Sequence, residues 1–93
     1  MKKYKIRKLK YNDNYGKDIK LHVQELELRD NTEEFAGYWD IRLGKIKGFT
    51  LKEGDNCNFI FEADNDVQLI GEGKVQYDGS EGYNLIGKNI DLK

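Results

Sequence analysis

The side chains that could perform acid, base or nucleophilic chemistry are few in this sequence. His22 is the only histidine and Cys57 the only cysteine, while Ser80 lies in a turn-forming stretch. A catalytic triad holds its members within hydrogen-bond distance of one another, and no spacing ties His22 to Ser80 or to Cys57. A structural zinc site uses about four cysteine or histidine ligands, and this chain lacks them. We therefore predict no catalytic residue, no metal site and no cofactor, and we expect that the protein is not an enzyme.

The strongest charge feature is the N-terminal stretch. Residues 1–11 hold six basic side chains and no acid, whereas the remainder holds 10 basic and 17 acidic side chains. Two explanations stay open. The lysines could protect an edge strand against aggregation. Alternatively, the stretch could face phosphates or a nucleic acid backbone, with Tyr4 and Tyr11 interleaved. The basic residues are Lys2, Lys3, Lys5, Arg7, Lys8 and Lys10.

Alternation of apolar and polar residues predicts strands along most of the chain. Trp39, Ile41 and Leu43 alternate with polar residues or glycine, which is the period of a strand with one buried face. Turn-forming residues such as Asp78-Gly79 separate such segments. The strands predicted in this way cover residues 3–11, 18–29, 35–43, 46–52, 56–63, 67–77 and 82–92.

In three of these segments the apolar side chains change face midway. The changes fall near Arg7 in the first segment, near Gln24 in the second and around Gly87 in the last. A β-bulge at each point would keep the apolar residues on one side of the sheet. In addition, Gly71 and Gly73 share the inward face of 67–77, which indicates a sharp bend or a close approach of another group.

Long strands with bulges coil strongly, and strongly coiled sheets close on themselves. The chain has no proline that would forbid pairing. The predicted fold is therefore all-β: a small closed or partly open antiparallel β-barrel of about six to seven strands. A β-sandwich with similar strands is the alternative.

Length and composition set the organisation of the chain. Ninety-three residues make one domain, 1–93, because two cores of half this size would be too small to stand alone. No apolar run approaches the roughly 20 residues of a membrane span. The N-terminal stretch lacks the apolar region of a secretory signal. Cys57 has no partner for a disulfide, and we predict that it is a small core residue. These features favour a cytoplasmic protein with no membrane partner.

The segment GEGKVQYDGSEGYNLIGKNIDL, residues 71–92, resembles the closing hairpin of PilZ domains. The order of DIRLGKIKG, LKEGDNCNFIFE and this hairpin is also similar to the order of PilZ strands. The resemblance covers residues 38–92 and implies a small β-barrel with a regulatory role. PilZ domains that bind cyclic di-GMP carry R-x-x-x-R and D-x-S-x-x-G. Here Lys3 and Arg7 stand at the first spacing, and Asp40 matches the aspartate of the second. Arg42 and Lys45 occupy its serine and final glycine positions.

Our first functional hypothesis is a non-catalytic binding module that presents its basic N-terminal strand to an anionic ligand, either a cyclic dinucleotide or a nucleic acid backbone. Arginine and lysine side chains suit phosphate recognition. The predicted ligand-binding residues are Lys3, Arg7, Lys8, Asp40 and Arg42.

The alternative is a protein-binding adaptor or inhibitor, of the kind that phages and mobile elements encode. It would act through a sheet edge or through an acidic rim at one end of the barrel. An exposed edge strand would also allow two copies of the chain to pair as a homodimer. The acidic residues expected in the rim are Glu53, Asp55, Glu62, Asp64 and Asp66.

Overall fold

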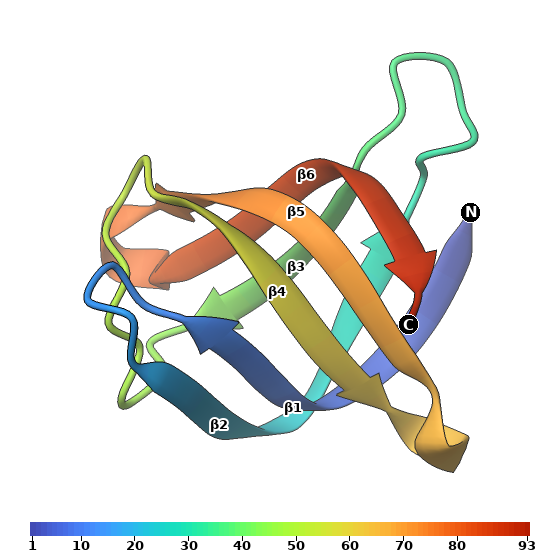
Figure 1. The fold of residues 1–93 in the computed structure, drawn as a ribbon. Coiled ribbons are helices and arrows are strands. Elements are labelled where there is room, and N and C mark those ends of the chain that lie inside the picture. The colour runs from blue at the N-terminus through green and yellow to red at the C-terminus, as the bar shows by residue number, and fades with distance from the viewer.

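The computed structural model describes residues 1–93 as six antiparallel strands that close into a barrel (Figure 1). The only helical segments are two short 3-10 turns, η1 (Asp64–Asp66) and η2 (Gly79–Glu81). No helix in the structure has the length and apolar character needed to cross a membrane. The prediction of an all-β barrel is confirmed. Its strands are β1 (Lys2–Asn12), β2 (Asp18–Asp30), β3 (Trp39–Gly44), β4 (Asn56–Ala63), β5 (Gln68–Tyr77) and β6 (Tyr83–Leu92).

Two three-stranded meanders build the barrel. β1, β2 and β3 pair in chain order, and so do β4, β5 and β6. β3 pairs with β6 and β4 pairs with β1, which closes the sheet in the order β1-β2-β3-β6-β5-β4. The β3–β4 connection runs along one end of the barrel, and both chain termini lie toward the other end (Figure 1).

The basic strand β1 is not an edge strand. It pairs with β2 along its length, and residues 6–10 also pair with β4. The explanation that its lysines protect an exposed edge is therefore wrong for this middle part. The longer unpaired side belongs to β2: residues 18–27 pair with β1 alone, and β3 joins β2 only at residues 28–30.

The changes of face in the sequence correspond to shifts in strand register. In the β1–β2 pair, Arg7 alone lies opposite residues 23–25, between the pairs Ile6–Leu26 and Lys8–His22. In the β5–β6 pair, Gly73 alone lies opposite residues 87 and 88. All three predicted bulge positions are thus confirmed, and each shift keeps the apolar side chains on the inner face.

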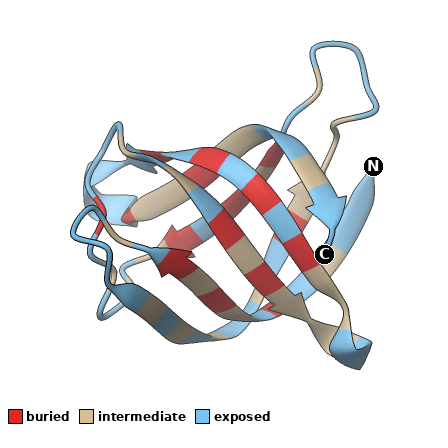
Figure 2. Cartoon of the chain, in the orientation of Figure 1, coloured by how far each residue is buried: buried red, intermediate tan, exposed pale blue.

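Trp39 fills the middle of the barrel and is 0% exposed. Its indole lies against Gly87, the residue paired with it on β6, and against Gly71 and Gly73 of β5. A Cβ atom added at Gly73 would lie 2.6 Å from Cζ2 of the indole, and one at Gly87 would lie 2.7 Å from its Nε1. Neighbouring atoms cannot approach so closely, so the predicted close approach at the inward glycines is confirmed. Buried positions alternate along the strands around this centre (Figure 2).

The predicted strand 46–52 is wrong, because this segment forms a loop between β3 and β4. Gly44, Gly48 and Gly54 adopt φ values of 68°, 83° and 90°, which interrupt an extended chain. The alternation of Phe49 and Leu51 still has a structural cause. Leu51 is buried, and the Phe49 ring packs at 5.6 Å from Tyr11 and 4.9 Å from Tyr83, measured between ring centroids. The loop therefore closes one end of the barrel without pairing as a strand.

The predicted strand 35–43 begins later than expected, at Trp39. Residues 31–38 form the β2–β3 loop, which projects from the barrel (Figure 1). Only from Trp39 onward does the chain pair with β2 and β6.

We expect Gly73→Ala to destabilise the protein, because the new methyl group must displace the Trp39 indole. The cost should be about 1–3 kcal/mol, as for other overpacked cores. Urea unfolding measures it. Gln76→Ala, at an exposed position of the same strand, is the matched control and should change the unfolding free energy by less than about 0.5 kcal/mol.

A double-mutant cycle separates this clash from a loss of strand propensity. In the Trp39→Phe background the smaller ring leaves room, so Gly73→Ala should cost less than it does alone. Equal costs in both backgrounds would contradict the packing argument.

Candidate functional site

The predicted ligand residues on β1 point outward, and each of them meets a carboxylate. Lys3 lies 3.8 Å from Glu27, and Arg7 lies 3.0 Å from Glu25 and also contacts Asp64. Across β1 as a whole, five of the six basic side chains form ion pairs in this way. Lys2 pairs with Glu33, Lys3 with Glu27, and Arg7 with both Glu25 and Asp64. Lys8 and Lys10 share Glu62.

Glu62 on β4 is shared by two of these lysines. Lys10 donates a hydrogen bond to it at 2.8 Å, and Lys8 lies 3.8 Å away. The hydrogen bond from Lys10 is the main reason that the pKa of Glu62 lies below its ordinary value. Similarly, the hydrogen bond to Asp64 raises the pKa of Arg7. The basic excess of the N-terminal stretch is therefore balanced in space by acids from β2, β4 and the connecting turns.

Asp40 and Arg42, the other two predicted ligand residues, lie on β3. Asp40 accepts two hydrogen bonds from Arg29 of β2, at 3.0 Å and 2.5 Å, in a fork that the sequence alone does not reveal. This pairing raises the pKa of Arg29. Arg42 is exposed and belongs to none of the barrel's ion pairs.

The register brings some of the predicted residues together and separates others. Lys3 pairs with Arg29, which pairs with Asp40, so these three form one row across three strands. Arg7 and Lys8 lie farther along β1, at its bulge and beside β4. The five predicted residues do not surround a common pocket.

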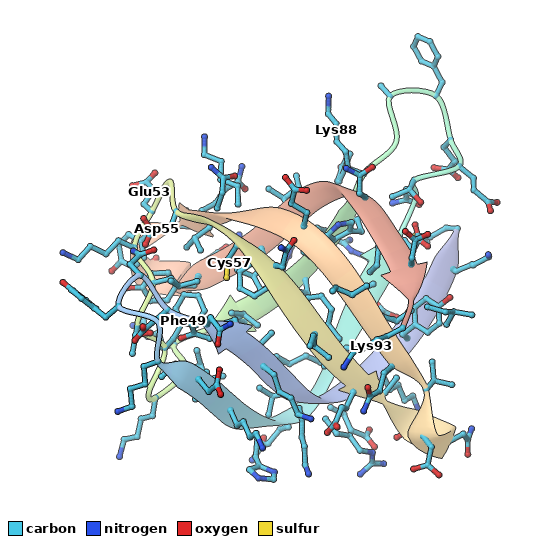
Figure 3. The ribbon with its side chains drawn as sticks, viewed as in Figure 1. Phe49, Glu53, Asp55, Cys57, Lys88 and Lys93 are labelled. Carbon is cyan, nitrogen blue, oxygen red and sulfur yellow. The ribbon has the colours of Figure 1, made fainter.

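The expected acidic rim at one end of the barrel is wrong. Glu53 and Asp55 precede β4 at the end that the β3–β4 loop closes (Figure 3), whereas Asp64 and Asp66 follow β4. The eight residues of β4 separate the two groups, which corresponds to roughly 25 Å of strand. Acids that are close in sequence are thus split between opposite ends.

His22, Cys57 and Ser80, the side chains that could act as a base or a nucleophile, lie on three different elements. His22 is exposed on β2, and Ser80 is exposed in η2. Cys57 on β4 is half-buried (Figure 3), and its thiol donates to the backbone carbonyl of Asn12 at 3.3 Å. Burial raises the pKa of this thiol, which lowers its reactivity. No group of three His, Cys, Asp or Glu side chains is arranged to hold a metal ion.

Phe35 is the most exposed aromatic side chain of the structure, at 103%. It lies in the β2–β3 loop, where Tyr38 is also exposed, at 43%. Sequence reasoning missed this residue because an apolar side chain before Trp39 continues the apparent strand pattern. The contrary signal was present in Asn31 and Gly37, turn-forming residues that flank it.

Hydrogen bonds hold the β2–β3 loop in one shape. Asn31 N–H donates to the carbonyl of Tyr38 at 3.0 Å across the base of the loop. Thr32 donates from both its backbone and its hydroxyl to Asp30, at 2.9 Å and 2.6 Å. Ala36 has a φ of 53°, a left-handed conformation that costs energy in any residue with a Cβ. The loop therefore presents Phe35 from a fixed and locally strained backbone.

A shallow groove of about 290 Å³ lies on the outer face of the barrel. The register sets its composition: Lys20 lies opposite Lys10, Lys10 opposite Ile60, and Ile60 opposite Ile70. Ile60 stands between Phe59 and Phe61, whose side chains are buried. Because side chains alternate along a strand, the sequence already indicated that Ile60 points outward. The groove is lined in part by Lys10, Asp18, Lys20, Asn58, Ile60 and Ile70.

Comparisons of this chain with protein-family models, with curated proteins and with solved structures find no match. The resemblance to PilZ domains accordingly stays a prediction.

We expect Glu62→Gln to weaken the protein near neutral pH but not in acid. Because folding lowers the pKa of Glu62, its contribution to stability is present above the unfolded value, about 4.3, and is lost as the pH falls through the folded value. The difference at neutral pH should be about 0.2–1 kcal/mol, as for ion pairs near the surface.

Urea unfolding at a series of pH values measures this difference. Glu81→Gln, which removes an exposed acid outside the ion pairs, is the control and should track the wild type throughout. If the difference in unfolding free energy between Glu62→Gln and the wild type stayed constant into the acid range, packing and not charge would account for it.

Proposed function

We propose that this chain is a non-catalytic binding module that docks onto a partner protein through its β2–β3 loop, residues 31–38. The observation that carries the proposal is the fully exposed Phe35 on a backbone fixed by hydrogen bonds. Burying a phenylalanine side chain contributes about 1.5–3 kcal/mol. A partner that covers Phe35 would gain this contribution.

The fixed shape of the loop favours binding for a second reason. Association costs free energy when loops and side chains must become ordered. The bond between Asn31 and Tyr38 already closes this loop, and Gly37 is packed so tightly that an added Cβ would lie 2.1 Å from the Asn31 carbonyl oxygen. The loop backbone therefore needs little further ordering for Phe35 to enter a pocket, and aromatic anchors in pockets are typical of the residues that dominate interfaces.

The charges beside Phe35 indicate the character of the partner. Glu33 and Glu34 precede it and are exposed, with long contacts of 3.7 Å to Lys2 and 3.8 Å to the N-terminal amino group. Contacts of this length near solvent contribute little. The partner surface that fits is an apolar pocket with a basic rim.

An anionic ligand on the β1–β2 face is the second candidate. The observation that favours it is one pair of like charges, since Lys10 lies directly opposite Lys20. Like charges directly opposite one another destabilise a sheet, and a bound phosphate would relieve this. It ranks second because Lys3, Arg7, Lys8 and Lys10 already have carboxylate partners that a ligand would have to displace.

A photo-crosslinking amino acid at position 35 tests the protein-binding proposal. In an extract of the source cells it should form a discrete adduct that excess wild-type protein competes away and excess Phe35→Ala does not. The same group at Tyr15, which is 95% exposed on the β1–β2 loop, is the matched control. Equal adducts at the two positions, or equal competition by both proteins, would contradict the proposal.

Titration of labelled cyclic di-GMP and of single-stranded DNA at two salt concentrations tests the second candidate. Binding should be saturable, should weaken with salt and should fall with Lys20→Glu. Flat curves for both ligands would exclude it.

A further inference from the structure

The groove on the outer face combines an apolar floor with a basic edge. Ile60 and Ile70 form a cross-strand pair that faces outward, and Ile70 is 37% exposed. Lys10 and then Lys20 follow on the β1 side of this pair, and Asp18 also lines the groove. Lys10 is bonded to Glu62, whereas Lys20 belongs to none of the ion pairs and is the free positive charge of this edge. The groove thus has the character that the β2–β3 loop requires of a partner.

The size of the groove also suits an aromatic ring. Its volume is about 290 Å³, and a cavity of about 150 Å³ is enough to hold benzene. The loop of the same molecule cannot fill it, because β2 carries the chain from Lys20 at the groove to Asp30 before the loop begins. This stretch spans roughly 30 Å of strand, and the loop then projects away from the barrel (Figure 1).

We propose that this groove binds Phe35 of a second copy of the chain. This inference rests on the proposed function, since it names a partner for the same loop. Phe35 packs against the side chains of Ile60 and Ile70, and Glu33 and Glu34 of the incoming loop lie toward Lys20.

The symmetry of this contact is head-to-tail. Each copy offers one loop and one groove at different places, so the contact is heterologous and can be repeated from copy to copy. One loop in one shallow groove buries less surface than a standard stable interface. Self-association is therefore weak, concentration-dependent and sensitive to salt, because part of the contact is between exposed charges.

Sedimentation of the full chain from micromolar to millimolar concentration, at low and at high salt, tests the proposal. The wild type should self-associate, and more weakly at high salt. Phe35→Ala should weaken self-association on the order of tenfold or more, as for a central aromatic anchor. Ile70→Asp and the exposed Lys20→Glu should weaken it from the groove side, while Tyr15→Ala should behave as the wild type.

Mixing the two defective variants gives the sharpest result. Phe35→Ala keeps an intact groove and Ile70→Asp keeps an intact loop, so an equimolar mixture should form dimers that grow no further, although each variant alone associates more weakly than the mixture. Circular dichroism of each variant checks that the barrel is folded, and Lys20→Glu replaces Ile70→Asp if it is not.

Three outcomes would overturn the inference: a wild type that stays monomeric at millimolar concentration, a dimer that persists in Phe35→Ala, or a mixture that does not associate. A persistent dimer would instead point to pairing along the free side of β2, residues 18–27. A monomeric wild type with a Phe35-dependent crosslink to another protein would leave the proposed function intact and remove only the second copy as its partner.

Discussion

The structure depends on the fit of one indole ring against three positions that have no side chain. Trp39 can occupy the barrel centre only because Gly71, Gly73 and Gly87 face it. Its Nε1–H donates to the carbonyl of Asn89 at 2.8 Å, just beyond the bulge at Gly87. The ring thereby holds β3, β5 and β6 in one register, since a slip by one residue would place side chains where the indole lies.

That register also determines what the outside of the barrel presents. Once β5 is placed against β4, Ile70 must lie opposite Ile60, and Asp40 of β3 must lie opposite Arg29 of β2. Outward positions alternate with inward ones along each strand, so the interior packing fixes which exposed side chains become neighbours. The strand register likewise places carboxylates beside the basic side chains of β1, although those acids are distant from β1 in sequence.

The features that the sequence predicted well are those that one strand carries by itself. The face changes near Arg7, Gln24 and Gly87 were visible as breaks in alternation, and the close approach at Gly71 and Gly73 was visible as glycines on an inward face. Segment 46–52 failed because alternation reports burial, not pairing. Its loop buries Leu51 as a strand would, but left-handed glycines keep it from running beside another strand. Tertiary structure decides which strands pair, and it also decides which carboxylates pair with the basic side chains of β1. Neither can be read from the pattern of a single strand.

The filled interior decides where this protein can bind anything. Trp39, Phe59 and Phe61 are 0% exposed and pack ring against ring, so the barrel leaves no inner cavity like those of larger ligand-binding barrels. Recognition must then use the outer face or the loops, and these differ in energetic character. The basic side chains of β1 are largely paired with carboxylates, and an anionic ligand there must displace these partners. Phe35 has no partner to displace, and hydrogen bonds already close the base of its loop, so covering it is the interaction with the least opposing cost.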